Sequence, residues 1–162
     1  MNKYRTHNCS ELNEKNIGKK VKLSGWVHRK RDHGNLLFID LRDHFGLTQC
    51  VTENKDKDFK ILEKIKPESV ITIEGNVVKR SKETENKELK TGLIEIKIVE
   101  AKILSEAKEL PMPVFGEQEY PEETRLKYRF IDLRRNEMHE NIKLRSKILS
   151  FIRSKMIQSN FL

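Results

Sequence analysis

The chain has 162 residues, of which 36% are hydrophobic and 36% are charged, and its formal net charge is +8. This length allows one or two small globular domains. No stretch approaches the ~18 apolar residues of a membrane-spanning helix, so a cytoplasmic protein that does not bind membranes is expected. The two cysteines, Cys9 and Cys50, and the five histidines share no metal-ligand spacing, which argues against a zinc site.

Charge is distributed unevenly along the chain. Residues 1–51 hold 10 basic and 5 acidic side chains, residues 52–124 hold 13 and 17, and residues 125–162 hold 10 and 3. Basic ends around an acidic middle are typical of a protein that faces a polyanion such as nucleic acid. A general lysine bias is the alternative, but it does not explain the consecutive basic residues at positions 29–31.

Residues 21–29 indicate a first strand whose alternation breaks at Gly25. Glycine inside a strand often marks a bulge or a bend. We therefore expect Trp26 to turn onto the same side of the strand as Val21 and Leu23.

Residues 36–42 alternate cleanly after a turn at residues 32–35. Neighbouring side chains in a strand point to opposite faces. One set is Leu37, Ile39 and Leu41, and the other is Phe38, Asp40 and Arg42. The first set predicts a core face, whereas the second places an aromatic ring beside charges on the face that meets solvent.

The following elements have the spacing of a small β domain. They are a third strand (47–51), an amphipathic helix (59–65), a fourth strand (70–78), an exposed loop (79–89) and a fifth strand (93–103). In the fifth strand, Glu95 and Lys97 point outward between inward isoleucines. Three strands, a helix and two strands is the element order of the OB-fold, a five-stranded barrel that binds oligonucleotides.

The sequence thus predicts a mainly β protein: an OB-fold barrel over residues 1–106 with a short helix between its third and fourth strands. Residues 107–124 hold three of the four prolines and read as a linker. Residues 125–162 predict a separate helical segment, with Asn136 as the cap of a helix that runs to about Gln158. The apolar face of that helix needs more protein to cover it, so we expect a fragment of a longer chain.

Phe38 is the centre of a candidate nucleic-acid surface. Bases stack on exposed aromatic rings while basic side chains hold phosphates, and Arg29 and Arg31 lie near Phe38 in sequence. Gln49 follows on the next strand, and its amide can both donate to and accept from a base edge. A ring covered by a neighbouring loop is the alternative interpretation.

Three runs resemble the N-terminal part of bacterial aspartyl-tRNA synthetases. They are GWVHRKRDHGNLLFIDLRDHFGLTQCV at residues 25–51, TGLIEI at residues 91–96 and EETRLKYRFIDLRR at residues 122–135. The similarity extends from about residue 3 to the last residue. It implies an anticodon-binding barrel, followed from about residue 122 by the truncated start of a class II catalytic domain.

The resemblance also implies roles for individual residues. Phe38 would stack on the middle anticodon base, Gln49 would read the edge of that base, and Glu95 would meet the first base. Arg31, within the basic run that begins at Arg29, would hold the anticodon backbone or the third base.

Two loop positions bear on the choice of tRNA. In the family that the chain resembles, members that also charge the asparagine tRNA with aspartate tend to carry His at the position of His33, so the resemblance implies this relaxed charging for the full-length enzyme. The two anticodons differ only in the third base. Glu83 matches a second position tied to that relaxed choice, although a small residue is expected there. An ordinary turn residue is the alternative for His33.

No catalytic residue, metal site or phosphate-binding loop is expected within these residues. In the full-length enzyme, the resemblance implies ATP and magnesium as cofactors, tRNA as the partner and a homodimer, whereas the fragment alone could be monomeric. A free-standing OB-fold protein that binds single strands is the competing function. A purely structural barrel leaves the basic cluster unexplained.

Overall fold

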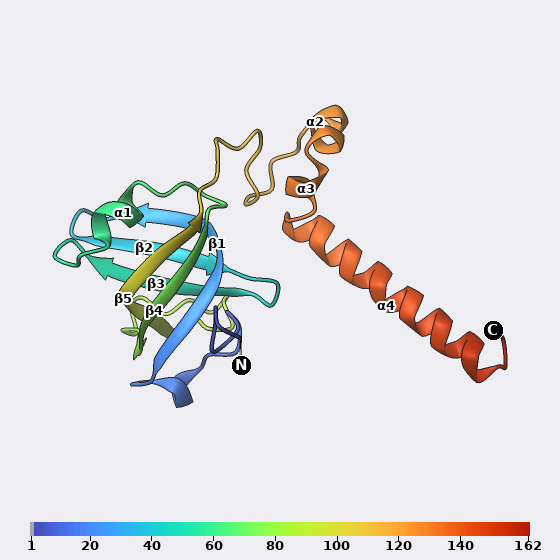
Figure 1. The fold of residues 1–162 in the computed structure, drawn as a ribbon, viewed down its shortest axis with the longest axis horizontal. Coiled ribbons are helices and arrows are strands. Elements are labelled where there is room, and N and C mark those ends of the chain that lie inside the picture. Colours follow the sequence, from blue (N-terminus) through green and yellow to red (C-terminus); the bar gives the residue numbers. More distant parts are fainter. Residues whose placement is uncertain (1) are drawn as a thin grey trace. The chain divides into compact units, whose positions relative to one another are not determined.

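The computed structural model describes residues 2–162, and the chain divides into two compact units at Leu110 and Pro111. The first unit contains five strands and two short helices (Figure 1). These elements are η1 (Glu14–Asn16), β1 (Lys20–Asp32), β2 (Leu36–Arg42), β3 (Leu47–Glu53), α1 (Phe59–Glu63), β4 (Val70–Lys79) and β5 (Ile94–Ser105).

The five strands form a closed barrel in the order β1-β2-β3-β5-β4. All neighbours are antiparallel except β3 and β5, which are parallel. The short helix α1 lies between β3 and β4. The mainly β, five-stranded barrel expected from the element order is therefore confirmed.

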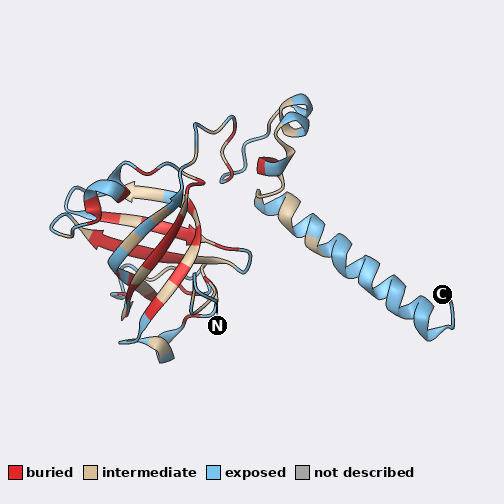
Figure 2. Cartoon of the chain, in the orientation of Figure 1, coloured by how far each residue is buried: buried red, intermediate tan, exposed pale blue. Residues whose placement is uncertain are grey.

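Apolar side chains form the core of the barrel, and buried residues recur along its strands (Figure 2). Leu37, Ile39 and Leu41 of β2 are fully buried, as the alternation predicts. The same core contains Ile71, Ile73 and Val77 from β4, Ile94, Ile96 and Ile98 from β5, and Phe59 and Leu62 from α1. Because alternate residues of these strands are inward, the residues between them form the outer surface of the barrel.

Strand β1 differs from its prediction. It continues to Asp32, so the basic run lies on the strand, and its irregularity falls between Val27 and Arg29 rather than at Gly25. Gly25 is needed for a close approach, because a Cβ there would lie 2.2 Å from the backbone oxygen of Arg42. Trp26 does not join the core; it is half-buried, and the Arg42 guanidinium carbon lies 5.9 Å from its ring centroid.

The second unit contains α2 (Glu122–Lys127), α3 (Arg129–Asp132) and α4 (Asn136–Gln158). Asp132 is fully buried and accepts hydrogen bonds from two arginines, including Arg125 Nε at 3.1 Å. The α4 helix ends at Gln158 as predicted, but its N-cap is Arg135, so the expected cap Asn136 is instead its first residue. No residue of α4 is buried, and within residues 2–162 no helix is long and apolar enough to span a membrane.

Candidate nucleic-acid interface

A one-residue bulge decides where the basic run of β1 points. Val27 pairs with Leu41 but Arg29 pairs with Asp40, so His28 is the extra residue. A single extra residue reverses the alternation of a strand. Without the bulge, strict alternation from the buried Val27 would point Arg29 and Arg31 into the core. The bulge turns both side chains to the outer face.

The Lys30 side chain points to the opposite face of β1 from Arg29 and Arg31. Its Nζ donates to the backbone oxygen of Glu63 and, at 3.1 Å, to that of Ile65. These carbonyls lie at the C-terminal end of α1, where a cation is favourable. Lys30 thus anchors a helix, while Arg29 is exposed and Arg31 is half-buried on the outer face.

Arg31 joins β1 to β2 and β3 through its guanidinium group. Its Nη2 lies 2.8 Å from Oδ1 of Asp40 and 3.1 Å from Oε1 of Gln49. Asp40 and Gln49 are direct partners across β2 and β3, so their side chains share the outer face. The face of Gln49, which the sequence leaves ambiguous, is therefore the same as that of Asp40.

Two neighbours fix the orientation of the Gln49 amide. Its Oε1 accepts from Arg31, which can only donate, and its Nε2 donates to Oε2 of Glu95 at 2.9 Å. The reversed amide would place like groups against both partners. These two bonds use one hydrogen and one of the two oxygen lone pairs of the amide, and Gln49 as a whole is 8% exposed.

Arg80 completes the network and was not identified from the sequence. Residues 79–89 predict an exposed loop, but Arg80 is only 4% exposed, which corrects that expectation. Its Nε donates to the backbone oxygen of Ile94 and lies 4.0 Å from Oε2 of Glu95. Burial lowers the pKa of its guanidinium group, and its Nη2 has no hydrogen-bond partner among the described residues. An arginine directly after Lys79 at the end of a strand gives no sequence signal that a loop will cover it.

Phe38 lies beside this network on the outer face of β2. It pairs across strands with Arg31 and with Val51, and its side chain is half-exposed. The ring lines a groove of about 330 Å³. The groove is also lined by Leu36, Val51, Glu53, Val78, Ser81, Thr84, Glu95 and Lys97. Among residues 2–162, the Phe38 side chain therefore stays partly exposed at the groove, despite the contact with the turn before β2.

The two loop positions lie on different turns of the barrel, and His33 contacts the Phe38 ring. The exposed His33 contacts Phe38 edge-to-face, with ring centroids 5.6 Å apart and an interplanar angle of 86°. Glu83 is exposed on the turn between β4 and β5, between the groove-lining Ser81 and Thr84. Four of the predicted residues, Arg31, Phe38, Gln49 and Glu95, thus come together, with Arg29 and Glu83 at the margins.

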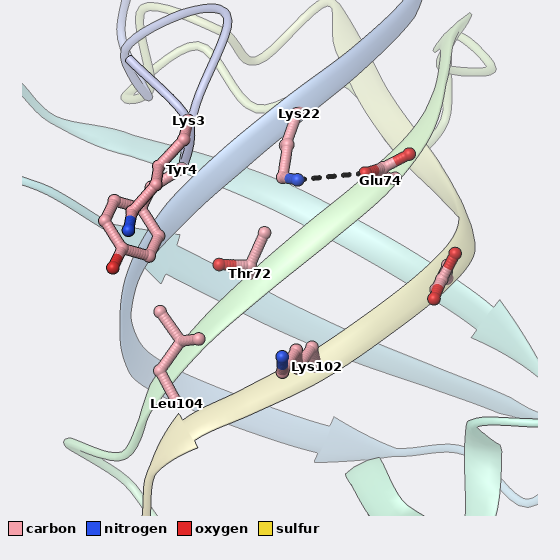
Figure 3. Close-up of a pocket in the computed structure, with 8 residues that line it drawn as sticks. Lys3, Tyr4, Lys22, Thr72, Glu74, Lys102 and Leu104 are labelled. Atoms are coloured by element: carbon pink, nitrogen blue, oxygen red, sulfur yellow. Dashed lines mark ion pairs between the residues drawn. The ribbon is translucent and has the colours of Figure 1, made fainter.

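A second groove of about 350 Å³ lies over β1, β4 and β5 (Figure 3). Figure 3 shows Lys22 of β1 reaching toward Glu74 of β4, and their charged atoms are 3.1 Å apart. Tyr4 contributes an aromatic ring, with the Lys3 ammonium 4.9 Å from its centroid. This groove combines aromatic and basic groups without a side-chain amide among its lining residues.

Neither groove offers an obvious metal site. Among residues 2–162, no group of three or more His, Cys, Asp or Glu side chains could hold a metal ion. Cys9 and Cys50 are both buried free thiols, and desolvation raises the pKa of each. The outer face of the barrel therefore offers hydrogen bonding, charge and an aromatic surface, which are the groups that nucleic-acid binding uses.

Two family descriptions match the chain. Residues 21–104 match the OB-fold nucleic acid binding domain, which covers the barrel, and residues 121–162 match the class II tRNA synthetases (D, K and N). The first match spans more than half of the chain. It includes Arg31, Phe38, Gln49 and Glu95.

The curated relatives include aspartate–tRNA(Asp/Asn) ligases from several bacteria. The chain is 61% identical to the one from Pelagibacter ubique and 56% identical to the one from Phenylobacterium zucineum, over 162 residues in each case. All of this chain is aligned, but it spans only 27% of the length of each relative.

Solved structures share the fold. Asparaginyl-tRNA synthetase from Pyrococcus horikoshii, complexed with asparaginyl-adenylate, is 25% identical with a TM-score of 0.80, over 94% of this chain and 34% of that one. Aspartyl tRNA synthetase from Entamoeba histolytica has a TM-score of 0.86 at 20% identity, over 96% and 38% of the two chains. The second likeness concerns the fold alone.

Proposed function

The chain belongs to the family of OB-fold nucleic acid binding domains, and from this premise we propose that it reads the anticodon for an aspartate–tRNA ligase. One observation supports this function above all. An aromatic ring, an oriented amide and a guanidinium group lie together on the outer face, on three adjacent strands. Unpaired anticodon bases present π-faces and hydrogen-bonding edges that match these groups.

Phe38 stacks on the middle base of the anticodon. The ring lies on a strand, and its backbone is fixed by pairing on both sides. Stacking on such a ring contributes about 1–3 kcal/mol per base. Stacking is nearly independent of base identity, so the ring supplies affinity and the neighbouring polar groups supply specificity.

Gln49 reads the edge of the same base. Its amide presents an acceptor and a donor side by side, in an order fixed by Arg31 and Glu95. A base that offers an adjacent donor and acceptor, as uracil does at N3 and O4, complements this pair. Uracil is the middle anticodon base opposite the adenine of aspartate codons.

The charged members of the network hold the flanking nucleotides. Arg31 and Arg29 provide guanidinium groups for the anticodon backbone or the third base, and the Glu95 carboxylate accepts from the first base. Glu95 is held by Gln49 at 2.9 Å and lies near Arg80. These contacts hold the carboxylate in place before RNA arrives, which reduces the entropic cost of binding.

The full-length protein activates aspartate with ATP and magnesium and transfers it to the aspartate tRNA, and also to the asparagine tRNA. The curated relatives carry both tRNAs in their names. His33 and Glu83 are the positions that we connect with this relaxed choice. Charging of both tRNA transcripts by the full-length enzyme is expected, and failure to charge the asparagine tRNA would contradict this part of the proposal.

The remaining organisation follows from the same function. Residues 1–106 form the anticodon-binding domain, residues 107–124 the linker and residues 125–162 the start of the catalytic domain. The enzyme acts in the cytoplasm as a homodimer, and the exposed apolar side chains of α4 lie at or near surfaces covered in the full-length protein. Those side chains include Ile142, Leu149, Ile152 and Met156.

Binding of the 162-residue chain to RNA hairpins tests the anticodon function. We expect the anticodon stem-loop of the aspartate tRNA to bind more tightly than the same hairpin with cytosine at the middle position, because cytosine reverses the hydrogen-bonding pattern met by Gln49. Equal affinity for both hairpins would instead indicate a free-standing single-strand binding protein. That alternative also predicts a salt dependence set by phosphate contacts alone.

A further inference from the structure

We infer that His33 acts on the anticodon through the Phe38 ring, as a positioning residue that holds the stacking surface. This inference rests on the proposed anticodon function and deepens it. The imidazole and phenyl centroids are 5.6 Å apart at an interplanar angle of 86°. This is the edge-to-face arrangement that aromatic pairs favour.

The turn between β1 and β2 fixes the backbone of His33. Its N–H donates to the backbone oxygen of Leu36 at 2.9 Å, and its own carbonyl accepts from Asn35 at 3.0 Å. The N–H of Gly34 donates to Oδ1 of Asp32 at 2.7 Å, and Gly34 has a φ of +75° that favours glycine.

A second anchor connects this turn to the far end of β3. The N–H of Asn54 donates to the backbone oxygen of Asn35 at 2.9 Å. Hydrogen bonds within the turn therefore hold it, and so does the residue directly after β3, the strand that contains Gln49. His33 contacts Phe38 from a fixed backbone, which a freely moving loop residue could not do.

Two sets of neighbours hold the Phe38 side chain in place. Arg31 and Val51 flank it across the strands, and His33 contacts it from the turn. A ring already held in its binding orientation loses less conformational freedom when a base stacks on it. Removal of the imidazole would therefore weaken stacking even though no contact between His33 and RNA is lost.

A double-mutant cycle separates this role from direct reading of the RNA. His33→Ala, Phe38→Ala and the double variant of the 162-residue chain are titrated with the aspartate anticodon stem-loop. We expect His33→Ala to weaken binding by about 2- to 12-fold, the range of an edge-to-face pair. In the Phe38→Ala background the same substitution should have no effect.

Each outcome of this cycle has a distinct meaning. Equal losses from His33→Ala in both backgrounds, or no loss in either, overturn the inference and leave the proposed function intact. No loss from Phe38→Ala contradicts the proposed function itself. The two failures are thus distinguishable in one experiment.

A conservative variant supplies a readout that a general folding defect would not give. His33→Phe keeps a ring in the turn but removes both imidazole nitrogens, and we expect it to restore binding to within about 2-fold of the unmodified chain. Direct hydrogen bonding by the imidazole predicts instead that His33→Phe is as weak as His33→Ala.

His44 offers a matched control in the other hairpin turn. Its ring contacts Phe45 edge-to-face with centroids 5.2 Å apart, but neither residue lines the Phe38 groove. His44→Ala should leave RNA affinity unchanged. A 2-aminopurine at the middle anticodon position measures stacking on Phe38 directly, because stacking quenches its fluorescence. We expect less quenching with the His33→Ala variant than with the unmodified chain, and the same quenching with His44→Ala.

Discussion

The two grooves on the barrel are similar in size, at about 330 and 350 Å³, and differ in how their side chains are fixed. Each contains a glutamate between two lysines: Glu53 lies 2.6 Å from Lys55 and 2.7 Å from Lys97, and Glu74 lies 3.2 Å from Lys20 and 3.1 Å from Lys22. Basic charge alone therefore does not distinguish a binding surface on this molecule.

The distinguishing feature is the rigid set of groups around Phe38. Phe38 lies on a strand next to an amide and a guanidinium group that orient each other. Tyr4, the aromatic residue of the second groove, lies on the N-terminal segment before β1, with Lys3 against its ring (Figure 3). We conclude that ordered hydrogen-bonding partners, rather than an aromatic residue with lysines, mark the RNA-reading face.

Replacement of the two aromatic residues should show the largest contrast. Phe38→Ala should weaken binding of the aspartate anticodon stem-loop by about 1–3 kcal/mol, because it removes the stacking surface. Tyr4→Ala is the matched control and should leave the affinity unchanged. Fluorescence anisotropy with a labelled hairpin measures both, and equal losses would contradict the assignment of the binding face.

The amide should have the next largest effect. Gln49→Ala removes the base-edge contact and leaves Arg31 and Glu95 without their shared partner, so a loss of about 1–2 kcal/mol in binding is expected. Thr72→Ala removes a polar side chain of the second groove, which lies 2.7 Å from the Ser24 hydroxyl, and should have no effect on binding. The loss for Gln49→Ala should shrink when the middle base is cytosine; an equal loss on both hairpins would argue against base reading.

Protonation of Glu53 and Glu74, which each pair with two lysines, should have a smaller effect. It should lower the stability of the folded state, and only at acidic pH. Hydrogen bonds from Lys55 and Lys97 lower the pKa of Glu53 to about 2, and those from Lys22 and Lys20 also lower the pKa of Glu74. The folded pKa lies below the unfolded value, so the stabilisation is present above the unfolded pKa and is lost as the pH falls through the folded one. Carboxyl NMR titration measures this directly, and Lys97→Met should raise the pKa of Glu53. An unchanged pKa in that variant would contradict the ion pair.

The smallest expected effect is that of a lysine in the second groove. Lys102→Ala removes one exposed charge and should change RNA affinity by less than about 0.5 kcal/mol. Comparison with Arg31→Ala under the same salt conditions shows whether position or charge matters. Similar losses for the two variants would favour non-specific attraction to the whole barrel.

The alternation of strand residues was sufficient to predict most of the barrel. Leu37, Ile39 and Leu41 are inward because a period of two on a closed sheet leaves no other arrangement for three apolar residues. The outward position of Phe38 follows from the same rule, and so does that of Glu95. These are local patterns, and the sequence displays them directly.

The parts that sequence could not predict depend on contacts between distant segments. The bulge at His28 sets the direction of Arg31, and its position depends on pairing with β2. Lys30 is a basic residue like its neighbours Arg29 and Arg31, but it caps a helix more than 30 residues away in sequence. Arg80 is buried and donates to the backbone oxygen of Thr84, in the segment between β4 and β5, so its place beside Glu95 is visible only in the structure.

Chemical-shift mapping of the 162-residue chain with the aspartate anticodon stem-loop is the most direct test of the binding face. We expect the backbone amides of Arg31, Phe38, Gln49 and Glu95 to shift on binding, while those of Lys22, Thr72, Glu74 and Lys102 remain unchanged. Shifts confined to the second groove, or spread evenly over both faces, would contradict anticodon reading by the Phe38 face.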